Sequence, residues 1–298
     1  MQLFVARRIL LTLAYSEQFQ FPLKASELFT RLLTKISVTV DEFVAALTFL
    51  VDKQLISYDS GYFVISGLSG SDIKKLVDTR VERAEYASKK WSEVLDFISV
   101  IRSIPFITGV AVTGSLAVHN TIKDDDIDFM IVTPKNRLWL ARLLVVLYAS
   151  LRGKRRSFAK EEKNSWCFNL WIEESDLQLP VGARSVYEAY EVIQATWVLS
   201  RGGVANRFRR LNDWTKKIVP RARKFCDVIE QKSTTVFDLP VISQMLDVCN
   251  QTAYYFQFQY MKSHMTREKV SKSHAFFHPR DTKSEVFKNW KKTILRLL

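Results

Sequence analysis

The 298-residue sequence predicts an α/β fold with a mixed sheet at its core. The first observation is a set of apolar runs of strand length, at residues 107–112, 127–132 and 166–172. The second is a pair of longer segments with helical spacing of apolar residues, at 72–102 and 137–152, which alternate with these runs. Strands that alternate with helices along a chain are typical of α/β domains.

Residues 1–67 predict a small separate domain of the winged-helix type. Helical spacing occurs at 6–19, 24–33 and 41–54. Two strand-like runs then flank Asp59-Ser60-Gly61, a turn sequence that favours a hairpin. Three helices followed by a hairpin are the order of elements expected for a winged helix.

The third of these helices indicates what the domain contacts. Asp41 is expected to cap it. Glu42 and Asp52 add negative charge, against Lys53 alone. A recognition helix in a DNA groove lies close to phosphates, so these carboxylates would repel DNA. The sequence therefore favours a protein-contact or structural role for residues 1–67, and DNA reading is the alternative.

A Gly-Ser pair followed by two spaced aspartates is the most informative feature of the next segment, residues 70–180. Gly114 and Ser115 follow the first strand-like run, and Asp126 and Asp128 stand at the start of the second. Residues two apart on a strand share a face. The two carboxylates are therefore expected to point the same way and to suit a hard divalent cation. The glycine lets the backbone approach a phosphate, to which the serine hydroxyl and nearby amides can donate.

This spacing resembles the signature of the DNA polymerase β-type nucleotidyltransferase superfamily. Further stretches are similar to a group of prokaryotic nucleotidyltransferase-domain proteins: KNRLWLARLL, GKRR, CFNLWIEES and AFFHPRD. The resemblance implies that Gly114 and Ser115 hold the triphosphate of a nucleoside triphosphate. It also implies that Asp126 and Asp128 bind Mg²⁺ or Mn²⁺, which in that superfamily bridges the phosphates and assists in-line attack by a hydroxyl. Residues 70–180 would then form the catalytic domain.

The superfamily also places an Asp or Glu on a further strand, as a third metal ligand and often as the base. The corresponding strand in this chain is WCFNLWI, where Asn169 stands in the carboxylate's place. An asparagine offers a carbonyl oxygen to a metal but cannot accept a proton. Glu173 lies four residues further on and is expected on the same face as Asn169. It is therefore favoured over Glu174 as a compensating carboxylate, with a solvated strand end as the alternative.

The charge of residues 151–298 points to a polyanionic partner. The chain has a net charge of +13, and this part of it carries 27 basic and 15 acidic side chains. Four helices are expected here, at 185–199, 207–218, 221–231 and 239–263. Residues 181–298 are thus predicted to form a basic helical domain. Such a domain favours contact with nucleic acid, RNA more than DNA, and solvated helix faces are the alternative.

The cysteines and the length of the apolar runs indicate where the protein is expected to be located. Cys167, Cys226 and Cys249 are far apart and odd in number, which is typical of reduced thiols in a cytoplasmic protein. The apolar runs are too short to span a bilayer, so no membrane contact is expected. Lys123, beside the signature loop, can offset triphosphate charge, although solvation is the alternative for it.

The expected function is metal-dependent transfer of a nucleoside monophosphate from a nucleoside triphosphate to an acceptor hydroxyl. An RNA end is favoured over a small molecule as the acceptor, because of the basic C-terminal part. The alternative is a non-catalytic nucleotide- or nucleic-acid-binding protein, in which Asn169 has removed the base.

Overall fold

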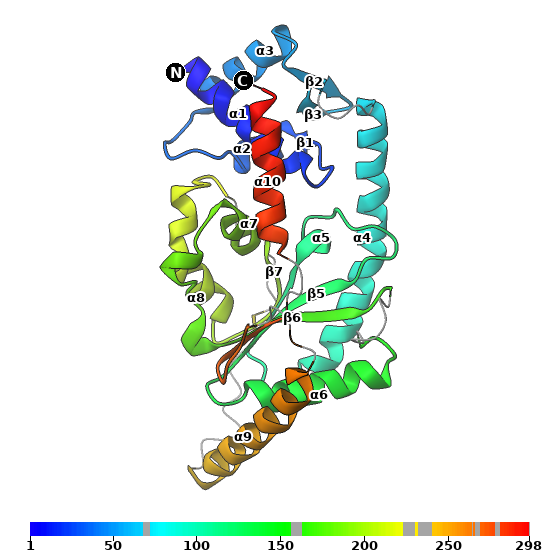
Figure 1. Ribbon diagram of the computed structural model, residues 1–298, viewed down its shortest axis with the longest axis vertical. Coiled ribbons are helices and arrows are strands. Elements are labelled where there is room, and N and C mark those ends of the chain that lie inside the picture. The colour runs from blue at the N-terminus through cyan, green and yellow to red at the C-terminus, as the bar shows by residue number, and fades with distance from the viewer. Residues whose placement is uncertain are drawn as a thin grey trace.

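The computed structural model describes a mixed α/β protein with one three-stranded and one seven-stranded sheet, which confirms the predicted α/β class. The described residues are 1–67, 72–155, 163–222, 230–231, 240–263, 265, 269–277 and 281–297. In Figure 1 the small sheet lies toward one end of the long axis and the large sheet lies in the middle. The long helix α4 (Ile73–Ile101) runs from one to the other.

The N-terminal unit has a core of its own. Its elements are α1 (Gln2–Glu17), β1 (Leu23–Lys24), α2 (Ala25–Thr30), α3 (Val40–Asp52), β2 (Ile56–Asp59) and β3 (Tyr62–Ile65). The strands form an antiparallel sheet in the order β1-β3-β2. Ile9, Phe43 and Ile56 are among the buried side chains that pack between the helices and this sheet. The predicted hairpin is confirmed, and so are the three helices, although α2 is shorter than expected.

The residue that caps the start of α3 is Thr39, so the prediction of Asp41 is wrong. The side chain of Thr39, not that of Asp41, accepts a hydrogen bond from the backbone N–H of Glu42 at 3.2 Å. Glu42 Oε2 in turn accepts from the N–H of Thr39 at 2.8 Å. This reciprocal pair is a capping box, which satisfies two backbone donors that the start of a helix leaves free. The pattern Thr-x-x-Glu is present in the sequence, two residues before Asp41.

The seven-stranded sheet contains strands that precede residue 180 in the sequence and strands that follow it. Its order is β8-β7-β4-β5-β6-β10-β9. The strands are β4 (Gly109–Thr113), β5 (Ile127–Thr133), β6 (Trp166–Glu173), β7 (Thr196–Arg201), β8 (Glu230–Gln231), β9 (Lys269–Val270) and β10 (His274–Phe276). β5 and β6 are parallel, whereas β4 is antiparallel to both β5 and β7. The predicted domain boundary at 180 therefore runs through this sheet.

Helices cover both faces of the large sheet. On one face, Phe97 of α4 packs against Phe129 of β5 in the largest core cluster. On the other face, Phe208 of α8 (Val204–Leu211) lies in a cluster with Met130 of β5. Neighbouring residues of β5 thus face opposite layers, as in any strand that is buried on both sides.

The C-terminal part is less helical than predicted. The expected helix at 185–199 ends early, because α7 spans Val186–Gln194 and β7 then forms a central strand. Short 3-10 turns lie at Glu174–Asp176, Val181–Ala183 and Asp213–Lys217. The helix expected at 239–263 is confirmed as α9 (Pro240–Lys262). The expectation of a mainly helical domain at 181–298 is wrong where strands β7 to β10 join the sheet. Most of the helix expected at 221–231 lies outside the described residues.

Helix α10 (Thr282–Leu295) returns to the N-terminal unit and packs beside α1 (Figure 1). Trp290 Nε1 donates to the carbonyl of Leu11 at 3.1 Å. The rings of Trp290 and Tyr15 meet edge to face, with centroids 5.4 Å apart. This contact joins segments that lie near opposite ends of the sequence.

Two expectations about the whole chain can be compared with the described residues. None of the helices in these ranges is long and apolar enough to cross a membrane. Cys167 is buried and Cys249 is exposed. Cys226 lies outside the described residues.

Candidate functional site

Gly114 forms the turn between β4 and the short helix α5 (Gly114–Ala117), where the sequence predicts a phosphate-binding turn. Its φ of +65° lies in the left-handed region that L side chains avoid. A Cβ atom at this position would lie 2.4 Å from Oδ2 of Asp128. The missing side chain thus brings the carboxylate directly against the turn, so a ligand held by the turn would also reach Asp128.

The two aspartates of the signature both reach the neighbouring strand β6. Asp128 Oδ1 accepts from Nδ2 of Asn169 at 2.5 Å. Asp126 Oδ1 accepts from the backbone N and the Oγ of Ser165 at 2.9 and 2.8 Å, and its Oδ2 accepts from Sγ of Cys167 at 3.2 Å. These bonds hold both carboxylates against β6 or the residue that precedes it. Of the two, Asp128 lines the large cavity described below.

The hydroxyl of Ser115 belongs to a network around Asp125, a residue that the sequence pattern does not single out. Ser115 Oγ donates to Asp125 Oδ2 at 3.1 Å. The same oxygen accepts from Oγ1 of Thr121 at 3.1 Å and from the N–H of Ile122 at 2.9 Å. The backbone carbonyl of Asp125 accepts from Nζ of Lys90 at 2.6 Å. Asp125 thereby fixes the loop that connects the glycine turn to the aspartates.

A β-bulge in β6 decides which of its residues face the site. The pairing register between β5 and β6 shifts just before Met130. An extra residue in one strand interrupts the alternation of its side chains. Phe168 and Trp171 consequently both pack toward α4, whereas Asn169 and Leu170 both line the cavity on the opposite side. Asn169 is thus placed beside Asp128, at the position from which a third carboxylate was expected.

The bulge also overturns the expected position of Glu173. Glu173 follows Trp171 by two residues, so it lies on the face opposite to Asn169, at the start of α6 (Leu138–Leu151). It is 3% exposed, and its Oε1 accepts from the backbone N–H of Asn136 at 2.7 Å. Burial raises the pKa of this carboxyl group, and hydrogen bonds from the backbone at the start of α6 partly offset the rise. Glu173 therefore anchors a helix start and is not a compensating carboxylate of the site.

A cavity of about 1080 Å³ lies in front of Gly114 and Asp128. Its walls come from the large sheet, from α7, from the start of α10 and from the N-terminal unit, through residues such as Leu170, Glu191 and Phe21. Its size is at the upper end of the range of sites that bind small molecules or cofactors. Lys123, predicted to offset triphosphate charge, is exposed in the signature loop and is not one of the cavity's lining residues.

Two glutamates of α7 line this cavity, and the sequence pattern singles out neither. Glu188 Oε1 lies 2.8 Å from Nζ of Lys283. Burial, followed by the charge of Glu188, raises the pKa of Glu191 to about 7. Burial also raises the pKa of Tyr187, to which the charges of Glu191, Glu188 and Asp128 contribute. These groups are therefore close enough to interact, and Glu191 can exchange a proton near neutral pH, as a general base must.

Replacing Glu191 by glutamine is expected to remove a pH dependence of folding stability. The pKa is raised in the folded chain from 4.5 to about 7, so the folded state holds this proton more tightly than the unfolded state. Its contribution to stability is fully present below 4.5 and is lost as the pH rises through about 7. Glutamine has no such proton to lose. Above neutral pH the variant should thus be more stable than the parent by about 1–3 kcal/mol.

Denaturant titrations of the two proteins at about pH 4 and about pH 8 measure this effect. The difference in unfolding free energy should vanish at the lower pH. A difference that is the same at both values would show that Glu191 titrates normally.

The oxygen atoms that the side chains of the site offer indicate which kind of metal ion binding they fit. Among the described residues there is no group of three or more His, Cys, Asp or Glu side chains that could hold a metal ion. Asp126 and Asp128 provide two carboxylates, and Asn169 provides an amide beside Asp128. Mg²⁺ usually keeps several waters and binds through one or two carboxylates together with substrate phosphates. These residues fit a cation that arrives with a triphosphate, and they do not fit a cage closed by protein ligands alone.

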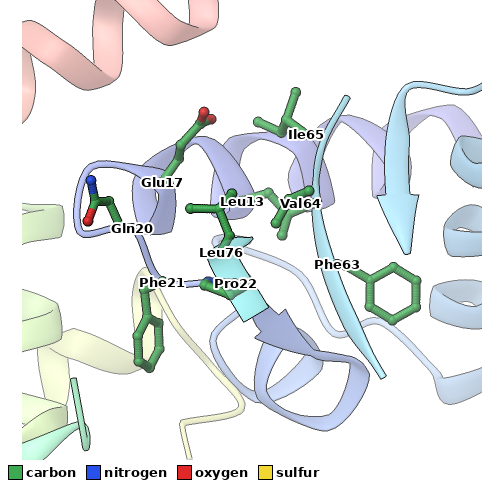
Figure 2. Close-up of a pocket in the computed structure, with 9 residues that line it drawn as sticks. All are labelled: Leu13, Glu17, Gln20, Phe21, Pro22, Phe63, Val64, Ile65 and Leu76. Atoms are coloured by element: carbon green, nitrogen blue, oxygen red, sulfur yellow. The ribbon is translucent and has the colours of Figure 1, made fainter. Parts of the chain in front are cut away.

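A second cavity, of about 210 Å³, lies within the N-terminal unit (Figure 2). Leu13, Val64 and Ile65 form part of its mostly apolar wall, with Glu17 as the one acid that lines it. Phe21 lines both cavities, and in Figure 2 its ring points away from the other side chains of this group. The small cavity contains no residue of the signature.

Several basic side chains of residues 151–298 form hydrogen bonds or ion pairs within the protein. Arg201 is 7% exposed and donates to the carbonyls of Ile104 and Ile107. Arg207 forms an ion pair with Glu174. Others remain at the surface: Arg152, Arg210, Lys216, Lys217, Lys288, Lys291 and Lys292. Arg156, Arg223 and Lys224, which belong to the predicted basic clusters, lie outside the described residues.

The comparisons with known proteins add no family to this geometry. Protein-family models, curated proteins and solved structures were compared with the chain, and none of them matched. The function is therefore inferred from the residues of the site themselves.

Proposed function

We propose that this chain is a metal-dependent nucleotidyltransferase that moves a nucleoside monophosphate from a nucleoside triphosphate to an acceptor hydroxyl. The observation that carries the proposal is the contact between Gly114 and Asp128. A left-handed turn, which a phosphate can approach, lies directly against a carboxylate that a cation can bind. Both line a cavity large enough for a nucleotide. The resemblance of the signature to the polymerase β-type superfamily supports the same assignment.

Each residue of the site has a separate role in the proposed reaction. Asp126 and Asp128 hold Mg²⁺ or Mn²⁺, which when bound neutralises charge on the phosphates and on the transferred group. The backbone of Gly114, with the neighbouring amides, donates to phosphate oxygens. Asn169 orients the Asp128 carboxylate through the 2.5 Å hydrogen bond. Glu191, with a pKa of about 7, accepts the proton of the acceptor hydroxyl.

A non-catalytic nucleotide- or nucleic-acid-binding protein is the second candidate. Asn169 favours it, because an amide stands where the superfamily carries its third carboxylate. Its side chain donates to Asp128 and cannot accept a proton. The two candidates share nucleotide binding and differ in turnover.

Release of pyrophosphate tests the proposal. The purified chain is incubated with each common nucleoside triphosphate and Mg²⁺ or Mn²⁺, with bulk RNA as acceptor and without added acceptor. Release that requires the metal supports transfer. Tight nucleotide binding without release supports the second candidate, and absence of both binding and release contradicts the two together.

The N-terminal unit supports the winged-helix part of the proposal. Its order of helices and strands, with the β2–β3 hairpin last, is the order expected for that domain. Asp41 and Glu42 lie in the first turn of α3. Their negative charge disfavours phosphate contact, so we assign this unit to a protein partner or to a structural role.

A nucleic acid is the proposed acceptor, bound through residues 151–298. The surface cations named above, on α8, on the 3-10 turn that follows it and on α10, support contact with phosphates. Within this proposal we favour RNA over DNA as the acceptor.

Replacing Asn169 by aspartate is expected to couple stability to Mg²⁺. Without metal, the change removes the donor to Asp128 and places two carboxylates side by side. The variant should then be less stable by about 1–3 kcal/mol. Added Mg²⁺ should restore most of this loss, because the metal binds between the two acids. Melting temperatures with and without Mg²⁺ measure it, and an equal loss in both conditions would remove Asn169 from the metal site.

A further inference from the structure

Arg31, at the end of α2, is a buried cation that forms no ion pair with another described residue. It is 9% exposed, and its Nε has no hydrogen-bond partner among the described residues. Glu27, whose charge acts on Arg31, is itself paired, because its Oε1 lies 3.2 Å from Nη2 of Arg80. The guanidinium lies over the ring of Phe21, with Cζ 5.3 Å from the ring centroid. An arginine stays charged under these conditions, and a buried charge that is not paired is costly.

Neighbouring residues contact the backbone of Arg31 and the aromatic ring on which its guanidinium lies. The Tyr190 hydroxyl, on α7, donates to the backbone carbonyl of Arg31 at 2.7 Å. The ring of Phe21 carries a second guanidinium, that of Arg80, at 3.8 Å. Tyr190 thus holds the backbone at Arg31, and the ring of Phe21 supports its guanidinium, which reduces the entropy that binding must remove.

Arg31 lines the same cavity as Gly114, Ser115 and Asp128, from the N-terminal unit. An unpaired buried cation in the wall of a binding cavity points to an anionic group of the ligand. A planar guanidinium suits the oxygens of a phosphate, which it can bind through two parallel hydrogen bonds.

Carboxylates of the cavity wall have partners of their own. Glu188 is paired with Lys283 at 2.8 Å. Asp176 Oδ2 lies 3.6 Å from Nδ1 of His274. Asp281 caps α10, accepting from the backbone N of Ser284 at 3.0 Å. These acids therefore leave Arg31 available to a ligand.

We propose that Arg31 binds the terminal phosphate of the nucleotide, so that the N-terminal unit supplies part of the nucleotide site. The inference rests on the proposed nucleotidyl function for the identity of the ligand. It assigns to this unit a role in which the triphosphate bridges the sheet, through Gly114 and Asp128, and α2, through Arg31. A nucleoside monophosphate lacks the terminal phosphate that Arg31 is proposed to bind.

The test measures binding of inorganic tripolyphosphate, ATP and AMP to the full chain by calorimetry, in EDTA and in Mg²⁺. Arg31→Met keeps the length of the side chain and removes its charge, and Arg31→Lys keeps the charge. Arg7→Met is the matched control, because it removes an exposed cation from the same unit. Melting temperatures of all variants without ligand are recorded beside the affinities.

Arg31→Met should weaken binding of tripolyphosphate and ATP roughly 10- to 100-fold and leave AMP binding unchanged. Arg31→Lys should recover part of the loss, because a lysine offers charge without the planar fork. Arg7→Met should bind like the parent. The melting temperature of ligand-free Arg31→Met should not fall, because the substitution removes an unpaired buried charge.

A fall in melting temperature together with equal losses for ATP and AMP would overturn the inference, because it would make Arg31 a structural residue. ATP binding that needs Mg²⁺ and Asp128 but not Arg31 would overturn it as well and leave the proposed function standing. Tripolyphosphate binding in EDTA that needs Arg31, with no pyrophosphate released from any triphosphate, would support the inference and contradict the proposed transfer.

Discussion

Replacing Asp128 by asparagine is expected to abolish metal-dependent nucleotide transfer while the fold stays intact. The asparagine keeps the size of the side chain and an oxygen that can accept from Asn169, so the bond between β5 and β6 persists. What is lost is the negative charge beside the Gly114 turn. A metal ion contributes several kcal/mol to a transferring phosphoryl group, so the rate should fall roughly a thousandfold or more. The free energy of unfolding should change by less than about 0.5 kcal/mol.

Asp124→Asn is the matched control for this variant. Asp124 lies in the same acidic run, but its carboxylate is at the surface and pairs with Nζ of Lys163 at 2.8 Å. It is expected to leave the rate unchanged. Pyrophosphate release and calorimetric binding of Mg²⁺-ATP measure both variants. Normal metal-dependent turnover in Asp128→Asn would refute the assignment of the site.

Replacing Gly114 by alanine should have the second largest effect, on stability and on nucleotide binding together. The φ of +65° costs an alanine about 1–2 kcal/mol. In addition, the new methyl group would lie 2.4 Å from Oδ2 of Asp128, and the carboxylate would have to move. Nucleotide affinity should therefore fall by at least about tenfold, since one displaced charged contact is worth roughly 1.5–3 kcal/mol.

Gly153→Ala separates these two causes. Gly153 has a φ of +64°, and a Cβ there would meet nothing within 4 Å. In denaturant titrations Gly153→Ala should lose only the stability that backbone strain costs, and Gly114→Ala should lose more because of the added contact with Asp128. Only Gly114→Ala should lose nucleotide affinity. If both bind nucleotide as the parent does, the turn does not hold a phosphate.

Local patterns were sufficient for the strands that carry the signature. The apolar runs at 107–112 and 127–132 correspond to β4 and β5, and the turn between them falls at Gly114. They failed at 185–199, where the apolar residues of α7 continue without a break into those of β7. A short apolar run that is buried on both faces has no periodicity to distinguish a strand from a helix.

The face of Glu173 was mispredicted for a different reason. The prediction assumed regular alternation of side chains along β6, but the bulge adds one residue to the spacing, which moves every later side chain to the other face. Arg31 and Glu191 could not be assigned from local patterns at all. Each comes to the cavity from an element far from the signature in sequence, and only the packing of the N-terminal unit and of α7 brings them there.

The contact between α1 and α10 can form only late in the synthesis of the chain. The hydrogen bond between Trp290 and Leu11 spans 279 residues, so a nascent chain cannot make it until nearly the whole of this sequence has left the ribosome. Until then Tyr15, which lines the cavity and is covered by Trp290, lacks its covering ring. Contacts of such long range are also slow to form. The large cavity is therefore expected to be completed in a late step, after the sheet has already formed.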